Sequence, residues 1–280
     1  MAYFIKRHAI LSYCVLVLLW SFVWWGLILT VAPIGTLFDP PVQPWAMVCM
    51  VLGGIGPSLM AFILTPIIEG PGSGRALLAR LKLWRVGWWW LALLIPFALN
   101  AVLFALYAMS GAQVSVADVW PKLLPAIFLG LYAGLSEEFG WRGFLLPRLQ
   151  RRYSPFVSAL LVGLVWGGFW HLYADYIGAF GNRGWWGAAL TIIQAPILLT
   201  AYSVMLTWVY NHTRGSMLLC VLFHAAISSS ALLFSVTYPT SEVYLAWATV
   251  YSLLAWIAAG ALVLVVRRKD ANAATSLRPA

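Results

Sequence analysis

The sequence predicts an all-α integral membrane protein of about eight transmembrane helices, with both termini in the cytoplasm. The 280 residues are 63% hydrophobic and only 9% charged, with 17 tryptophans. Soluble domains do not have this composition. The chain also divides into apolar stretches of about 20 residues, the length that crosses a bilayer core. These stretches lie at about residues 10–32, 45–68, 88–110, 122–146, 155–175, 185–210, 216–236 and 243–266.

The first apolar stretch follows a basic start at Lys6 and Arg7. It is longer than the apolar core of a signal peptide and lacks a small-residue cleavage site, so we expect it to be retained as the first transmembrane helix. The loops between the stretches are short, and no internal repeat is evident. We therefore expect residues 1–280 to form a single polytopic membrane domain.

The distribution of basic residues sets the predicted orientation. Nearly all of them fall on the side of the membrane that also holds the N-terminus, and the opposite side holds only Lys122 and Arg183. By the positive-inside rule this first side is cytoplasmic. The formal net charge of +9 then indicates contact with membrane lipid headgroups rather than nucleic acid. The residues on the cytoplasmic side are Lys6, Arg7, Arg75, Arg80, Lys82, Arg85, Arg148, Arg151, Arg152, Arg214, Arg267, Arg268 and Lys269.

Residues 73–87, SGRALLARLKLWRVG, alternate leucines with basic residues. This pattern predicts an amphipathic helix lying at the membrane interface, to which we assign no catalytic role.

Cys14, Cys49 and Cys220 lie in apolar stretches and show no ligand spacing, so they predict neither a disulfide nor a cysteine metal site.

Few ionisable residues lie at membrane depth, and such residues are functional candidates because burying them is costly. In the fourth stretch Glu138 and Arg142 are four residues apart and can pair on one helix face, whereas the adjacent Glu137 points elsewhere. The pair can either fix helix packing or take part directly in catalysis. Glu137 has no second cation nearby, which favours a catalytic role as a proton acceptor.

Two histidines follow on later helices, His171 in the fifth stretch and His224 in the seventh, with Ser228 one turn after His224. Either histidine alone would be read as a core residue. Together with Glu137 they predict a site at which a carboxylate, two imidazoles and a hydroxyl converge from three helices.

These motifs resemble the intramembrane protease family that includes the CAAX prenyl endopeptidases and the bacteriocin-processing or self-immunity proteins, called CPBP or Abi proteins. The Glu-Glu-x-x-x-Arg motif is complete at residues 137–142, VWGGFWHL at 165–172 resembles the second motif, and TRGSMLLCVLFHAAIS at 213–228 resembles the third. The resemblance covers about residues 122–235. It departs from the family twice: Gly167 stands where an aromatic is usual, and Ser228 stands where Asn is usual.

The resemblance implies that Glu137 activates the attacking water with help from His171, and that Glu138 and Arg142 hold the site. It further implies that His224 and residue 228 bind the developing oxyanion or a metal. Glu137, His171 and His224 could hold a catalytic zinc with a water in the open position. Because the sequence lacks an HExxH helix, a glutamate-activated water without metal is the alternative.

One distance conflicts with this convergence. At about 1.5 Å per residue, Glu137 and His224 lie about 12–14 Å from the cytoplasmic ends of their helices, whereas His171 lies about 24 Å deep if its helix begins at Pro155. Either that helix begins later, or Trp166–Gly168 breaks it.

The function expected from these residues and the resemblance is an intramembrane endopeptidase, in the bacterial cytoplasmic membrane, that cleaves a lipidated or membrane-associated peptide substrate through a cytoplasm-facing cavity. A non-catalytic bacteriocin-immunity or scaffold protein is the alternative, motivated by Ser228. A proton-coupled transporter is disfavoured because no paired interrupted helices occur in two related halves.

Overall fold

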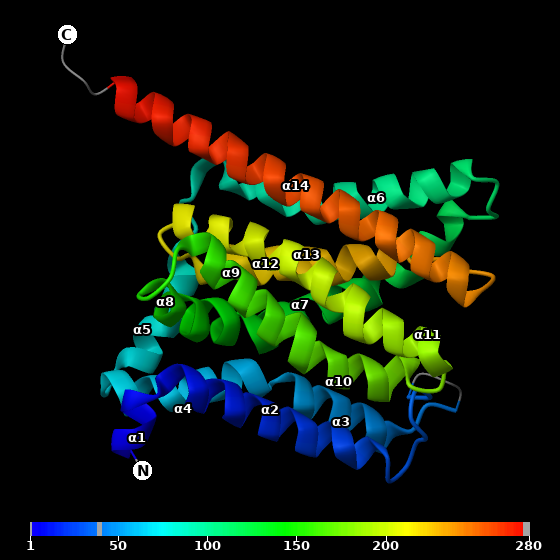
Figure 1. Cartoon of the computed structure of the whole chain (residues 1–280), viewed down its shortest axis with the longest axis horizontal. Coiled ribbons are helices and arrows are strands. Elements are labelled where there is room, and N and C mark those ends of the chain that lie inside the picture. Colours follow the sequence, from blue (N-terminus) through cyan, green and yellow to red (C-terminus); the bar gives the residue numbers. More distant parts are fainter. Residues whose placement is uncertain (1, 38–40, 277–280) are drawn as a thin grey trace.

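The computed structural model describes residues 2–37 and 41–276, and these residues form a bundle of helices without strands (Figure 1). Seven helical segments of this described part are long and apolar enough to cross a membrane, and the shorter apolar helix α13 lies among them. The prediction of about eight transmembrane helices is confirmed.

The eight crossings run in chain order and several are built from more than one helical element. The first three crossings are α1 (Ala2–Arg7) with α2 (Ala9–Ile28), α3 (Pro44–Gly54) with α4 (Gly56–Glu69), and η2 (Gly87–Leu93) with α6 (Leu94–Met109). The fourth is made of η3 (Val116–Lys122), α7 (Leu123–Gly140), η4 (Trp141–Leu145) and α8 (Leu146–Gln150), and the fifth of α9 (Pro155–Gly163), η5 (Leu164–Trp170), α10 (His171–Asp175) and η6 (Tyr176–Phe180). The sixth is made of α11 (Gly184–Ala189), η7 (Leu190–Gln194) and α12 (Ala195–His212), the seventh is α13 (Met217–Leu233), and the eighth is α14 (Ser241–Ser276).

The chain enters and leaves the bundle at the same end. In Figure 1 the start of α2 and the far end of α14 both lie on the left, together with α5 (Ser73–Ala79) and α8. This is the arrangement that an even number of crossings requires. The side chains of Arg267, Arg268 and Lys269, part of the orientation argument, lie outside the described residues.

Serine caps mark the N-terminal ends of α9 and α13. Ser154 accepts a hydrogen bond from the Val157 amide and precedes Pro155 at the first position of α9. Ser216 accepts one from the Leu219 amide at the start of α13. A serine cap satisfies an amide that the helix leaves unpaired, and proline is favoured at the first helical position. The fifth crossing therefore begins at Pro155, and the expectation of a later start is wrong.

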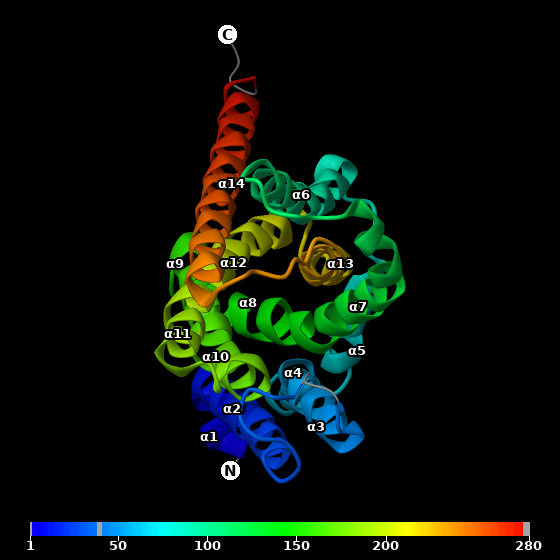
Figure 2. The same cartoon turned by 90° about the vertical axis from the view of Figure 1, so that its right-hand side faces the viewer.

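Helix α13 lies at the centre of the bundle (Figure 2), where it packs against α6, α7 and α12. Its closest neighbour is α7, which runs antiparallel to it and presents small residues at the contact. A Cβ atom at Gly130 would lie 2.5 Å from the Ala225 carbonyl oxygen, and one at Gly134 would lie 2.3 Å from that of Val221. Glycine spacing of four residues lets two membrane helices approach at backbone distance.

Four segments of the later crossings are π-helical: η4, η5, η6 and η7. A π-helix brings residues five apart onto one face and is found mostly at functional sites. The predicted break at Trp166–Gly168 is instead part of the continuous π segment η5. Segment η4 includes Arg142, and η5 ends directly before His171, so both adjoin the predicted site.

The segment 73–87 forms a shorter helix than expected, α5 followed by the single turn η1 (Arg80–Lys82). It also packs on the bundle. Arg80 donates two hydrogen bonds to the Gly215 carbonyl, at 3.0 and 2.6 Å, and the Ser216 hydroxyl donates to the Leu83 carbonyl at 2.6 Å. This segment therefore holds the N-terminal end of α13 in place.

Candidate active site

The adjacent glutamates at the end of α7 have different partners, as predicted. Glu138 Oε1 accepts a hydrogen bond from Arg142 Nη1 at 2.9 Å, and both side chains are fully buried. Glu137 does not share this pair. The helical spacing of the motif thus separates the two carboxylates onto two faces.

His224 joins the site from α13. Its Nδ1 atom donates a hydrogen bond to Glu138 Oε1 at 2.7 Å. Side chains tilt toward the N-terminus of their own helix. Because α7 and α13 are antiparallel, Glu138 and His224 tilt toward each other across the glycine contact. This bond leaves His224 Nε2 turned to Glu137, with its Oε1 atom 3.8 Å away.

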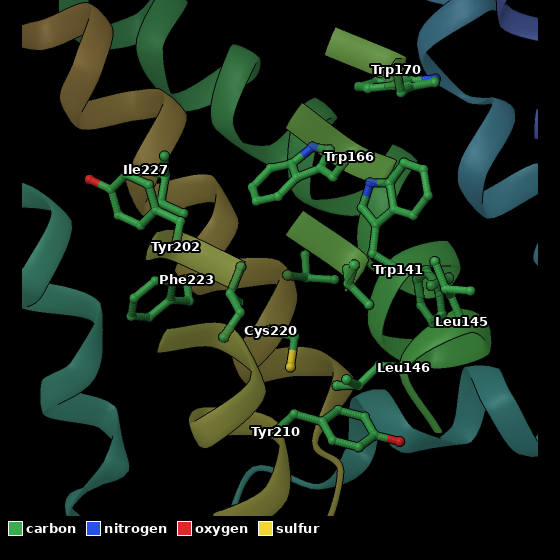
Figure 3. Close-up of a cluster of buried hydrophobic side chains, with 14 of the residues drawn as sticks. Trp141, Leu145, Leu146, Trp166, Trp170, Tyr202, Tyr210, Cys220, Phe223 and Ile227 are labelled. Atoms are coloured by element: carbon green, nitrogen blue, oxygen red, sulfur yellow. The ribbon is translucent and has the colours of Figure 1, made fainter. Parts of the chain in front are cut away.

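Two indole groups hold the other oxygen of Glu137. Trp141 and Trp166 both donate to Glu137 Oε2, at 3.1 and 2.7 Å. Figure 3 shows the nitrogens of these two rings facing each other. Glu137 is only 5% exposed. The two hydrogen bonds fix the orientation of this carboxylate while Oε1 stays available to a reactant.

Trp166 contacts both histidines as well as Glu137 and Arg142. Besides donating to Glu137, its ring lies 5.1 Å from the ring of His224 and 5.9 Å from that of His171. The Arg142 guanidinium carbon lies 5.0 Å from the Trp166 ring centroid, within the range of a cation–π contact.

The π-helical segment η5 explains how Trp166 stands in for the aromatic that the family places at residue 167. In an α-helix a residue four before His171 shares its face, but in a π-helix the residue five before it does. Gly167 instead packs on α12, where an added Cβ would lie 3.0 Å from the Cα of Pro196. The change of helix type compensates for the one-residue shift in the sequence.

His171 lies farther from the carboxylates than predicted. Its ring packs edge-on against Trp170 and its Nδ1 atom lies 3.5 Å from Asp175 Oδ1. Among the described residues it makes no hydrogen bond to Glu137 or His224. Trp166 stands between it and the carboxylate cluster, so of the three residues predicted to converge, only Glu137 and His224 approach each other directly.

His171 and Asp175 line a cavity of about 380 Å³ that also includes Asn100, Gln194 and Tyr238. Phe234 and Tyr238, beyond the end of α13, form part of its wall. This end of the bundle is opposite to the one that holds α5 and the start of α2, so the cavity lies on the side predicted to face away from the cytoplasm. Neither Glu137 nor His224 lines this cavity, so the expectation of a cytoplasm-facing cavity at the carboxylates stays a prediction.

Ser228 lies one turn beyond His224, on the same face of α13, and is half-buried. Its hydroxyl makes no hydrogen bond within the described part of the chain. Glu138 Oε2 and Arg142 Nη2 are also buried without a hydrogen-bond partner there. Unpaired buried polar atoms are rare in proteins, and these two belong to the ion pair of the predicted site.

The residues proposed as zinc ligands are not gathered around a common point. In the described ranges no group of three or more His, Cys, Asp and Glu side chains is arranged to hold a metal ion. His171 is turned to Asp175, whereas Glu137 and His224 are 3.8 Å apart. The predicted ligand set does not fit a metal in this structure, and the chemistry considered below uses the side chains alone.

Sequence reasoning missed Trp141 and Trp166 as site residues. Trp141 follows Glu137 by four residues, the spacing that placed Arg142 beside Glu138, so its contact was open to the same argument. Trp166 gave no such signal, because its position depends on the π-helical register.

Comparison with known proteins agrees with the region and order of these motifs. Residues 118–230 match the family described as Type II CAAX prenyl endopeptidase Rce1-like. The chain is also 30% identical over 123 residues to CAAX prenyl protease 2 of Methanococcus maripaludis. That alignment covers 42% of this chain and 43% of the relative, so the chain matches less than half of the relative's length.

The matched region holds both glutamates, Arg142 and both histidines of the site. Residues 118–230 are therefore similar to the CAAX prenyl endopeptidase family.

Proposed function

We propose that the protein is an intramembrane endopeptidase that hydrolyses a peptide bond in a lipidated or membrane-associated substrate. The observation that supports this best is the state of Glu137: one carboxylate oxygen is fixed by two indole N–H groups, and the other lies 3.8 Å from His224 Nε2. Amide hydrolysis needs a base for the water and an acid for the leaving amine. These two atoms can supply both.

In this proposal Glu137 Oε1 removes a proton from the attacking water, and His224 Nε2 gives a proton to the amine as the peptide bond breaks. Glu138 holds His224 by its Nδ1 atom and stabilises the positive charge that the imidazole carries when doubly protonated. Arg142 balances the charge of Glu138. The 3.8 Å distance supports His224 as the partner of Glu137 in this proposal, a role that the family resemblance gave to His171.

His171 and Ser228 have supporting roles. His171 lies on the wall of the cavity and reaches the carboxylates only through Trp166, so we assign it to guiding water or substrate toward Glu137. The Ser228 hydroxyl can donate one hydrogen bond to the developing oxyanion. Metal analysis of the purified protein, together with cleavage by metal-depleted protein, tests whether these side chains act without a metal.

The name of the relative and the location of the site support a proposal for the substrate class. The matched protein is named a CAAX prenyl protease, and the site lies among membrane-spanning helices. We therefore infer that the substrate is a prenylated or otherwise membrane-anchored peptide. That the protein acts in a bacterial cytoplasmic membrane stays a prediction.

Glu137→Gln tests the proposal. The amide keeps the size of the side chain but cannot take a proton from water. Cleavage of a prenylated peptide by purified protein should therefore fall about 100- to 10,000-fold, the usual contribution of base catalysis. Glu242→Gln is the matched control, because Glu242 is exposed at the start of α14. Full cleavage by the Glu137→Gln protein would exclude Glu137 as the base.

The unbonded Ser228 favours a second candidate, a non-catalytic immunity or scaffold protein. In that case a Glu137→Gln/His224→Ala protein would protect cells from a bacteriocin as well as the wild type does. Loss of protection in the double variant would argue for the endopeptidase instead.

A further inference from the structure

A pocket of about 220 Å³ lies at the end of the bundle where α5 packs between α4 and α8. It is separate from the carboxylates of the candidate active site, none of which lines it. Its polar lining residues are Thr65, Glu69, Ser73, Arg80, Arg148, Arg151 and Tyr210.

The pocket is strongly basic. Three arginines and one glutamate line it, a formal net charge of +2. Arg148 pairs with Glu69 at 2.5 Å and donates to the Phe144 carbonyl at 2.9 Å. Arg80 donates to the Gly215 carbonyl and lies over the Tyr210 ring. Since a guanidinium has five N–H donors, both residues keep donors unused.

Arg151 is exposed and forms neither a hydrogen bond nor an ion pair in the part of the chain that the structure describes. Arg80 and Arg148 are fixed in position by their carbonyl contacts. The pocket thus combines two preoriented cations with a third whose side chain is available to a ligand.

Thr65 provides a second, independent observation. It is only 5% exposed, and its hydroxyl has no hydrogen-bond partner among the described residues. A threonine inside a helix normally bonds back to a carbonyl one turn earlier, and Thr65 in α4 does not. A buried hydroxyl without a partner, next to three arginines, indicates a ligand with oxygen acceptors.

The surroundings indicate that this ligand is a lipid. On α4, Ile63 and Ile67 are 44% and 37% exposed, and on α5 Leu78 is 50% exposed. These apolar side chains belong to two of the helices that line the pocket, and the pocket lies at the end of the membrane-spanning part of the bundle, where a phospholipid headgroup would lie. Basic pockets between transmembrane helices on the cytoplasmic side are known to bind anionic headgroups.

We propose that this pocket, formed by Thr65, Arg80, Arg148 and Arg151, binds the phosphate of an anionic phospholipid headgroup. The phosphate accepts charge-assisted hydrogen bonds from the arginines and one from Thr65. The bound lipid bridges α4, α5 and α8, and through Arg80 it also contacts the segment that holds the start of α13.

The experiment measures binding of dioctanoyl phosphatidylglycerol to the purified full-length protein in detergent, by native mass spectrometry. Arg151→Gln should weaken binding about tenfold and Thr65→Val about fivefold, because each removes one hydrogen bond to the phosphate. Arg151→Lys, which keeps the charge, should retain most of the affinity. Arg152→Gln and Arg75→Gln are the matched controls and should leave binding unchanged, since both residues are exposed and neither lines the pocket.

Three results would overturn the proposal. Equal weakening by Arg152→Gln and Arg151→Gln would show a diffuse basic surface instead of a pocket. Equal binding of dioctanoyl phosphatidylcholine would remove the requirement for an anionic headgroup. Displacement of the lipid by an equal concentration of inorganic phosphate would show a general anion site that does not recognise lipid.

Discussion

Trp166 is the residue on which the candidate site depends most, although it cannot take part in proton transfer. Its N–H group holds Glu137 at 2.7 Å, and its ring lies beside Arg142, His171 and His224. Trp166 therefore sets both the orientation of the proposed base and the separation of the two histidines.

Trp166→Phe removes the N–H group and keeps most of the ring. A hydrogen bond to a charged group is worth about 1.5–3 kcal/mol, so kcat for peptide cleavage should fall about 10- to 100-fold while KM changes little. Trp170→Phe makes the same change at a tryptophan that donates to Ser21, outside the carboxylate cluster. Equal kcat values for these two variants would mean that the Glu137 contact is only structural.

Residue 228 allows a test of the departure from the family's usual asparagine. Asparagine is longer than serine and would reach farther along the face that His224 occupies. If residue 228 donates to the oxyanion, kcat should increase in the order alanine, serine, asparagine, with Ser228→Asn about tenfold above the wild type. Identical kcat values for Ser228→Ala and the wild type would show that Ser228 does not donate to the oxyanion.

At the scale of the helices, the contact between α7 and α13 determines whether the site forms. The bond between Glu138 and His224 needs the two backbones to approach closely, and Gly134 permits this approach. Gly134 therefore allows the side chains that carry the proposed chemistry to come together.

Gly134→Ala should lower both stability and cleavage. The added Cβ would lie 2.3 Å from the Val221 carbonyl oxygen, and the resulting overpacking costs about 1–3 kcal/mol. It should also move α13 away from Glu138. Gly260→Ala in α14 is the control, since no atom lies within 4 Å of its added Cβ. Thermal unfolding in detergent and peptide cleavage measure the two effects, and wild-type values for Gly134→Ala would contradict the packing argument.

The π-helical segments could not be predicted from the sequence. Paired glutamates and an arginine at fixed spacing identify one face of an α-helix, so the Glu138–Arg142 contact was predictable. No comparable pattern predicts that residues 164–170 are π-helical. The position of Trp166 depends on that register. The His171–Asp175 contact is instead a four-residue pair within the α-helix α10, so its spacing was present in the sequence although it was not predicted.

For the whole molecule, hydropathy predicted the crossings well because the membrane requires long apolar helices. The seven candidate spans and α13 fall on the eight predicted stretches, with ends that differ by a few residues. The position of the cavity was not predictable in this way, since it depends on how side chains from α6, α10, α12 and α14 leave space between them.

The predicted orientation places the basic headgroup pocket in the cytoplasmic leaflet and the cavity beside His171 toward the opposite side. It rests on the positive-inside rule, and it can be tested with cysteines at Gln113 and Arg152, which are exposed near opposite ends of the bundle. In right-side-out membrane vesicles, a membrane-impermeant maleimide should label Gln113→Cys and leave Arg152→Cys unlabelled. Inside-out vesicles should give the reverse pattern. Cys14, Cys49 and Cys220 are buried or half-buried, so the unmodified protein supplies the background. Labelling of Arg152→Cys in the right-side-out vesicles would show that the bundle has the opposite orientation, with the headgroup pocket in the outer leaflet.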